Sequence, residues 1–449
     1  MSVLDIPNFN RRGFIGLAGL AAGATALAAC GGPSTSGDSS ASTAAVDWKS
    51  ITPAKEIQFW SNHPGKSKEV EQAMIDAYNA SQTETKVSLV TAGANYEEVA
   101  QKFQTAQTGG QLPGVILQSD VWWFRNMLND LIIPMNDVME AVDFDTADYQ
   151  DALLKDYQYN DGQWGVPYAR STPLFYYNTE MFKAAGVEAP KTWDELAEMA
   201  PKIKAANSGL QNVYQHPAAS DYDSWTLQNK IWAWGGALSK DFDITCNSAE
   251  AVAAVKFSQD SVFTGKWAGI SAKDAGADFA AKAVACTVAS TGALVGILEA
   301  AQFEVGVAFL PGGPKETDMV CPTGGAGLGI PKNIKPEEQL AAAKFLKFIA
   351  TLENAAKFAT ATGYMPVRKS ADMSEVFKTR PQAKVAIEQL AHTRVQDNAR
   401  VFLPGADREI GKAHADVMTG TAKDAQARFD ELKTTLEGIY NKEVKPKLG

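Results

Sequence analysis

The sequence is poor in the residues that metal-dependent and nucleophilic enzymes use. Its 449 residues include only four cysteines and four histidines, at positions 63, 216, 392 and 414. The histidines form no His-Glu-x-x-His motif, and no cysteine or carboxylate stands near them at the spacing of metal ligands. No Gly-x-Ser-x-Gly elbow is present either. These absences argue against a zinc enzyme and against an α/β-hydrolase.

An excess of positive charge and a complete nucleotide-binding fingerprint are also missing. The formal net charge is −10, which argues against nucleic acid as a partner because binding its phosphates requires basic residues. The run Gly324-Gly325-Ala326-Gly327 lacks the trailing glycine and the acidic partner of a dinucleotide site. The many Asp and Glu residues permit a glycosidase pair, but nothing selects two of them. An enzyme acting on glycans or phosphodiesters stays open as an alternative.

One apolar stretch lies near the N-terminus, and no later run is long enough to span a bilayer. The pair Arg11-Arg12 precedes this stretch, and Leu27-Ala28-Ala29-Cys30 ends it. A charged start, a short apolar region and small residues at the end predict a signal peptide over residues 1–29. Residues 10–15 look like a twin-arginine signal, with the general export route as the alternative. The ending resembles the lipobox of bacterial lipoproteins, in which Cys30 is acylated, so we expect a lipid anchor on the extracytoplasmic face of the cell membrane.

The segment after Cys30 has the composition of a tether. Residues 31–45 are almost all Gly, Ser, Thr, Ala, Pro and Asp, so we predict a flexible linker over residues 30–48. The remaining length suits two domains, or one chain that crosses between two lobes. Cys246, Cys286 and Cys321 follow in this part, where an oxidising compartment permits one disulfide of undetermined pairing and leaves one thiol.

The first part of the body alternates between strand and helix patterns. Strands are predicted over residues 56–60, 86–91 and 113–118, and helices over 66–79 and 96–108. This alternation predicts a parallel sheet that is covered on both faces. Ligands of such sheets bind beyond the carboxyl ends of the strands. The segments that follow the three strands, 60–63, 94–96 and 118–120, are therefore expected at one rim.

Helix signals dominate the second part. Thr192 and Glu195 form the pattern of a capping box, and Pro336 has the position typical of a first helical residue. A further helix is predicted over residues 425–440. Residues 305–311 and 323–327, bounded by Gly or Pro, read as strands.

Several motifs appear in series along the body. Residues 170–178 read Arg-Ser-Thr-Pro-Leu-Phe-Tyr-Tyr-Asn, and they are followed by Glu353-Asn354-Ala355-Ala356 and Thr362-Gly363-Tyr364-Met365-Pro366-Val367. From about residue 60 to the C-terminus, the chain closely resembles the extracellular solute-binding proteins of carbohydrate-type ABC importers. The resemblance implies an α/β fold, the two-lobed periplasmic-binding-protein fold of type II, that closes on its ligand like a hinge. It also implies a monomer that is not an enzyme, needs no cofactor and delivers its ligand to ABC permease subunits.

The same resemblance implies how the chain is divided. The N-terminal lobe would comprise residues 49–170 and 306–350, and the C-terminal lobe residues 171–305 and 351–449. The chain would cross between the lobes near 171–178, near 305–311 and near 350.

Within that family the motifs are most similar to those of binding proteins for sn-glycerol 3-phosphate and glycerophosphodiesters. Tyr96, in Gly93-Ala94-Asn95-Tyr96-Glu97, would line the pocket. Asp120 replaces a pocket glutamate and would accept hydrogen bonds from glycerol hydroxyls, although it also suits a helix cap. Arg408 would meet the phosphate as a planar fork of donors, or else form a surface ion pair with Asp407 or Glu409. The matching motifs add four further pocket residues: Ser171, Ser290, Gly325 and Tyr364.

One departure from the pattern bears on the ligand. The family's pair of pocket tryptophans falls at residues 222–225, where Trp225 is retained and Tyr222 replaces its neighbour. An aromatic end of the pocket suits a quaternary ammonium group through cation–π attraction, as in glycerophosphocholine. Tyr222 equally suits stacking on a sugar ring. The alternative ligand is therefore a di- or oligosaccharide, in which case Arg408 would be structural.

Overall fold

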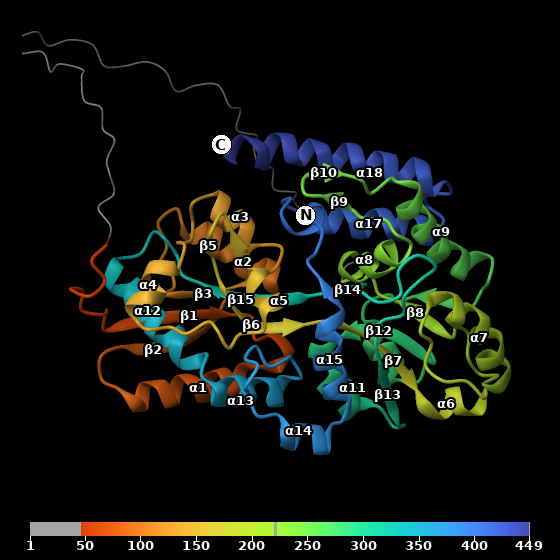
Figure 1. Ribbon diagram of the computed structural model, residues 1–449, viewed down its shortest axis with the longest axis horizontal. Coiled ribbons are helices and arrows are strands. Elements are labelled where there is room, and N and C mark those ends of the chain that lie inside the picture. Colours follow the sequence, from red (N-terminus) through yellow and green to blue (C-terminus); the bar gives the residue numbers. More distant parts are fainter. Residues whose placement is uncertain (1–45, 220–221, 449) are drawn as a thin grey trace, which may run out of the picture. The chain divides into compact units, whose positions relative to one another are not determined.

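The computed structural model of the protein describes residues 46–219 and 222–448. The described chain forms one compact unit that begins at Val46. The predicted signal peptide, Cys30 and the tether as far as residue 45 lie outside the described residues. Two five-stranded sheets organise the unit (Figure 1).

The first sheet is built around the strands that the alternation predicted. Its order is β2 (Lys86–Thr91), β1 (Glu56–Ser61), β3 (Val115–Ser119), β15 (Gly324–Gly329) and β6 (Val166–Ser171). The pairs β1–β2 and β1–β3 are parallel, as predicted, whereas β15 runs antiparallel to both β3 and β6. Helices cover this sheet: α1 (Lys68–Ser81), α2 (Tyr96–Ala106), α12 (Pro336–Ile349) and α13 (Leu352–Thr362). Phe59 on β1 packs against the rings of Tyr168 and Phe345, so the strand is buried between layers.

The helix predicted over residues 66–79 begins two residues later, at Lys68. A short 3-10 turn, η1 (Pro64–Lys66), precedes it, and both His63 and Lys66 have positive φ angles, of 58° and 59°. A left-handed residue cannot belong to a right-handed α-helix, which explains the later start.

The second sheet has the order β11 (Ala268–Ile270), β8 (Tyr214–His216), β12 (Cys286–Ser290), β7 (Pro173–Asn178) and β13 (Val305–Ala308). Strand β7 runs antiparallel to both of its neighbours. Its helices include α6 (Thr179–Ala184), α7 (Trp193–Ala206), α10 (Ala275–Ala280) and α11 (Leu294–Ala300). The capping box of α7 is confirmed, since Thr192 Oγ1 accepts from Glu195 N and the Glu195 carboxylate accepts from the Thr192 amide.

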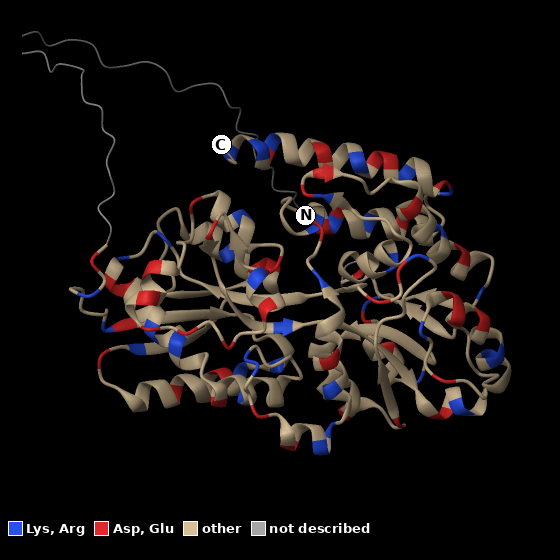
Figure 2. Ribbon diagram, viewed as in Figure 1, with Lys and Arg blue, Asp and Glu red and all other residues tan. Residues whose placement is uncertain are grey.

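A third group of helices packs at one end of the second sheet. It comprises α8 (Asp223–Ala233), α9 (Ala249–Phe263), α16 (Asn398–Val401), α17 (Ala406–Met418) and α18 (Ala425–Ile439). In Figure 1 α17 and α18 lie side by side in the blue C-terminal part of the chain. Acidic and basic residues alternate along the outer helices (Figure 2), as in the Lys412–Asp416 ion pair at 2.8 Å.

The chain passes between the two sheets at identifiable points. Only the buried Thr172 separates β6 of the first sheet from β7 of the second. A second passage leads from β13 through β14 (Cys321–Pro322) to β15. After α13, which contacts α1 and α12, the chain continues through α14 (Ser374–Thr379) to α15 (Gln382–Glu388), which contacts β13. The predicted lobe boundaries remain a prediction, although these contacts favour placing α13 with the first sheet.

Cys246, Cys286 and Cys321 are all free and buried. Burial raises the pKa of the Cys246 thiol to about 12 and shifts the pKa of the other two upward as well. The disulfide that the sequence permitted therefore does not form among these three residues. Across residues 46–219 and 222–448, no helix combines the length and the apolar character that crossing a membrane requires.

Candidate functional site

One cavity of about 650 Å³ brings together all the residues that the sequence selected as ligand-binding. They are Tyr96, Asp120, Ser171, Tyr222, Trp225, Ser290, Gly325, Tyr364 and Arg408. Tyr96 begins α2, Asp120 follows β3, and Ser171 and Ser290 end strands of different sheets. Because both sheets contribute, the cavity lies between them at their strand ends. Of the three segments that the alternation placed at one rim, 94–96 and 118–120 contribute lining residues, whereas 60–63 does not. Its volume is that of a small-molecule site.

Two tyrosines form one wall of the cavity. The hydroxyl oxygens of Tyr96 and Tyr364 lie 3.5 Å apart. Burial raises the pKa of both phenols, so that both remain neutral hydroxyls at physiological pH. One of the two donates to the other, so the pair offers one hydroxyl proton to a ligand oxygen.

Gly325 occupies a position that no other residue tolerates. Its φ angle is +98°, and a Cβ atom there would lie 2.1 Å from the carbonyl oxygen of Ala169. Its own carbonyl oxygen accepts a hydrogen bond from Asp120 N at 3.0 Å. Neighbouring Gly324 leaves space for the Trp225 ring, whose Nε1 donates to Thr323 O at 2.8 Å. The glycines thus let two strands and an aromatic ring approach closely.

Tyr222 and Trp225 form the aromatic part of the lining. Tyr222 stands at the N-cap of α8, and its ring meets that of Trp225 edge-on at 6.2 Å between centroids. Trp122 adds a third aromatic ring, over which the Arg125 guanidinium lies at 5.0 Å. Flat rings of this kind suit either a quaternary ammonium group or a sugar face.

Asp120 does not cap the following helix, since the N-cap of α3 (Trp123–Leu128) is Trp122. Its Oδ2 instead accepts hydrogen bonds from Arg400 Nη1 at 3.1 Å and from Gln396 Nε2 at 2.7 Å. Asp120 and Arg400 are each only 7% exposed. The carboxylate is therefore part of a buried ion pair rather than an end cap.

Sequence reasoning missed Arg400. Two contacts bring its helix, α16, to the cavity: β14 pairs in parallel with β16 (Thr393–Arg394), and Phe402 stacks on Phe124 of α3 at 4.0 Å between centroids. Arg400 and Asp120 are 280 residues apart in the sequence, so no local spacing signals their pairing. The same is true of Gln396.

Arg408 lies at the exposed side of the cavity, with 74% of its side chain accessible. Its Nη2 is 3.8 Å from Glu97 Oε1 on α2, and Glu97 is itself 42% exposed. The partner in the described chain is therefore Glu97, not Asp407 or Glu409. Burial raises the pKa of the nearby Asp407, with Arg400 opposing that shift.

Hydroxyl groups that can form further hydrogen bonds complete the lining. Ser119 Oγ is buried and has no hydrogen-bond partner among the described residues. Ser290 Oγ accepts from Gly292 N at 3.1 Å and keeps its own proton to donate. Nowhere in residues 46–219 and 222–448 do three His, Cys, Asp or Glu residues lie close enough to hold a metal ion. The cavity thus offers hydroxyls, aromatic rings and charges of both signs.

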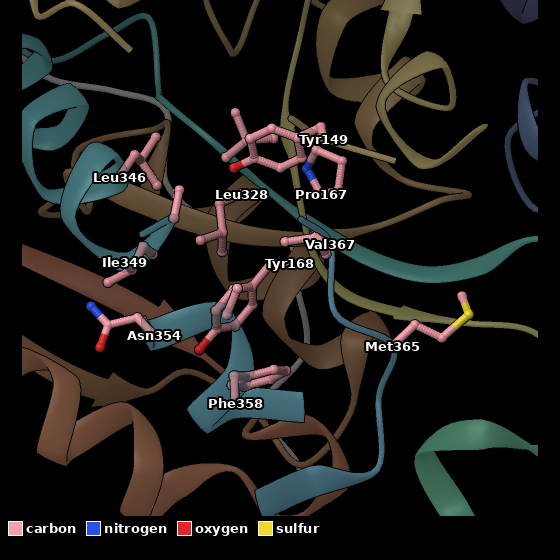
Figure 3. A pocket seen from close by; sticks show the side chains of 13 residues that line it. Tyr149, Pro167, Tyr168, Leu328, Leu346, Ile349, Asn354, Phe358, Met365 and Val367 are labelled. Atoms are coloured by element: carbon pink, nitrogen blue, oxygen red, sulfur yellow. The ribbon is translucent and has the colours of Figure 1, made fainter. Parts of the chain in front are cut away.

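A second cavity, of about 20 Å³, lies beside the first sheet between β6, β15, α12 and α13 (Figure 3). Apolar side chains dominate its lining, among them Leu328, Leu346, Ile349 and Phe358. It has room for about one water molecule and is a packing gap of the core.

Comparison with known proteins identifies relatives of the chain. Residues 73–385 match the family model of bacterial extracellular solute-binding proteins. The chain is 29% identical over 359 residues to the sn-glycerol-3-phosphate-binding periplasmic protein UgpB of Escherichia coli (strain K12), covering 74% of this chain and 80% of that protein. Its sequence is 39% identical to that of UgpB from Mycobacterium tuberculosis, whose crystal structure was determined in complex with glycerophosphocholine. The two structures have a TM-score of 0.82, and the match covers 87% of this chain and all of that one. Maltose-bound MalE3 of T. maritima has the same fold. It is 21% identical in sequence, with a TM-score of 0.75 over 86% of this chain and all of that one.

Proposed function

The chain belongs to the bacterial extracellular solute-binding proteins, and on that premise we propose that it captures a glycerophosphodiester, such as glycerophosphocholine, or sn-glycerol 3-phosphate. Members of this family bind solutes and are not enzymes. The chain is an ABC-importer solute-binding protein of the UgpB type. The importer's permease would receive the ligand from it.

The observation that carries the proposal is the convergence of nine residues on one cavity. They were selected from motifs scattered between residues 96 and 408, yet they line a single space. A relative with 39% identity over 87% of the chain was crystallised with glycerophosphocholine. Together these facts support a ligand of the same class.

The chemistry of the lining suits the three parts of such a ligand. The exposed guanidinium of Arg408 has the reach and the charge to meet a phosphate. Asp120 is an acceptor for the glycerol hydroxyls at the buried side. Tyr222 and Trp225 would surround a quaternary ammonium group through cation–π attraction.

The N-terminal sequence supports a location beside the permease. We propose that Cys30 carries a lipid and that the segment from residue 30 to residue 45 tethers the body to the outer face of the membrane. Residues 46–48, which the sequence placed in the tether, belong to the compact unit, and Trp48 packs against its core. The two lobes would close on the ligand about the passages between β6 and β7 and between β13 and β15.

Calorimetric titration of the purified body, residues 46–449, tests the proposal. The ligands are glycerophosphocholine, glycerol 3-phosphate, trehalose and maltose, and the variant is Arg408→Ala. Binding of either phosphate compound, weakened in Arg408→Ala, is the expected result. Binding of sugars alone would overturn the phosphate assignment and would favour the oligosaccharide alternative, which the rings of Trp122, Tyr222 and Trp225 also suit.

A further inference from the structure

The two oxygens of the Asp120 carboxylate have different surroundings. Gln396 Nε2 and Arg400 Nη1 both donate to Oδ2, at 2.7 and 3.1 Å. Within the described part of the chain, no group donates to Oδ1. Asp120 lines the cavity, so one oxygen is held by the protein while the other is left for whatever enters.

The two donors are themselves fixed by further hydrogen bonds. Arg400 Nε donates to Ser224 Oγ at 3.3 Å, and Arg400 Nη1 donates to Gln396 Oε1. Gln396 Oε1 also accepts from Gln228 Nε2 at 3.0 Å. The Gln228 side-chain oxygen Oε1 in turn accepts from the backbone N–H of Asp397 at 3.1 Å. This chain of bonds joins α8 to the segment before α16, and such a connected network restrains every member.

We infer that Gln396 and Arg400 are positioning residues that orient Asp120 Oδ1 toward a hydroxyl group of the ligand. The inference rests on the function proposed above and names the residues that would select ligands carrying hydroxyl groups. A carboxylate fixed in this way distinguishes ligands by their hydroxyls, because a ligand without them leaves a buried acceptor unpaired. Arg400 thus acts through Asp120, whereas Arg408 would contact the phosphate itself.

A pair of matched ligands separates these roles. Glycerophosphocholine carries two hydroxyls, whereas propyl phosphocholine keeps the phosphodiester and the choline but has none. We expect the wild-type protein to prefer glycerophosphocholine by about tenfold or more. In Arg400→Gln this preference should fall toward one, while the affinity for propyl phosphocholine stays near the wild-type value, because that ligand has no hydroxyl for Asp120 to bind.

Arg428→Gln is the matched control. It removes another arginine–aspartate pair, Arg428 Nε to Asp416 Oδ2 at 3.0 Å, which lies outside the cavity lining. The control should keep the wild-type preference. Arg400→Lys retains the charge but has a single donor nitrogen instead of the planar guanidinium fork, so it should have an intermediate preference.

Each remaining result has a defined meaning. An equal loss of both ligands in Arg400→Gln would place Arg400 on the phosphate and overturn the inference. An unchanged preference in Arg400→Gln would overturn it as well, while leaving the proposed function intact. A wild-type protein that binds neither phosphodiester would instead overturn the proposed function. If circular dichroism shows that Arg400→Gln does not fold, the test is repeated with Gln396→Ala. The ratio of its affinities for glycerophosphocholine and propyl phosphocholine should then fall toward one.

Discussion

Three arginine side chains at and behind the cavity, Arg170, Arg400 and Arg408, fall into two groups that differ in burial. Arg170 and Arg400 are 0% and 7% exposed and are bonded to the carboxylates of Asp156 and Asp120. Arg408 is 74% exposed, and its nearest carboxylate, on Glu97, lies 3.8 Å away. A buried pair with further hydrogen bonds holds the structure in one arrangement, whereas an exposed and loosely paired cation remains available to a ligand. Burial thus separates Arg170 and Arg400 from Arg408, which is suited to binding an anion. Arg125, which also lines the cavity, is half-buried and lies over the Trp122 ring.

The buried group should give the largest effect on stability. Arg170 donates to the Asp156 carboxylate and, at 2.9 Å, to Tyr157 Oη, and Asp156 also accepts from Thr323 Oγ1 at 2.6 Å. Arg170→Met would leave the Asp156 carboxylate buried without its cation. We expect the free energy of unfolding to fall by about 3–5 kcal/mol in urea titrations. A loss of unfolding free energy as small as that expected for an exposed ion pair would contradict the division of the arginines into buried and exposed groups.

The exposed arginine should affect binding instead of stability. In Arg408→Ala, the affinity for glycerophosphocholine should fall by about 1.5–3 kcal/mol, the contribution typical of a hydrogen bond to a charged group. The free energy of unfolding should change by less than about 0.5 kcal/mol because the side chain is in solvent. Calorimetric titration and urea unfolding of the same preparation measure both quantities. A large loss of stability would place Arg408 with the structural group.

Lys230 sharpens the comparison as a buried cation of a different kind. Its Nζ lies 3.1 Å from His216 Nδ1 and 3.3 Å from Ser258 Oγ, over the rings of Trp193 and Tyr214. Burial lowers the pKa of Lys230 from 10.5 to about 7, and Asp223 opposes this shift only in part. A buried amine without the close carboxylate that Arg400 has therefore gives up its proton readily.

Stability should consequently depend on pH through Lys230. Between pH 7 and 10.5 the unfolded chain binds a proton at this amine that the folded chain has released, so the free energy of unfolding rises with pH in that window. Urea midpoints measured at pH 7 and pH 9 should rise less in Lys230→Met than in the wild type. Lys412→Met, which changes an exposed lysine, is the control. Equal rises in Lys230→Met and the wild type would contradict the lowered pKa.

The smallest effect is expected from the partner of Arg408. Glu97→Gln removes the carboxylate that competes with an anionic ligand for Arg408. The affinity for glycerophosphocholine should increase by about two- to threefold at low salt, and the gain should shrink at high salt because both side chains are exposed. Titration at two salt concentrations measures this. A decrease would show that Glu97 contributes to binding.

Much of the fold could be predicted because its signals are local. The parallel start of the first sheet follows from strand and helix patterns that alternate over short distances, and the α7 capping box follows from Thr192 and Glu195, three residues apart. The prediction was wrong about the first residue of α1, where left-handed backbone at Lys66 interrupts the periodic pattern. The disulfide permitted by composition does not form, because pairing requires proximity that composition does not encode.

In the cavity, too, local motifs could be predicted and contacts between distant residues could not. Motifs in the sequence were enough to select nine residues that now line one space. The motifs did not reveal that Asp120 accepts from Gln396 and Arg400, or that Arg408 lies beside Glu97. The motifs are contiguous and carry their own chemistry, whereas an ion pair between residues 280 positions apart exists only after the chain has folded. The sequence by itself determined the family, the strand–helix order and the choice of cavity residues; only the tertiary structure decided which charges are buried and paired, because burial depends on contacts between distant segments.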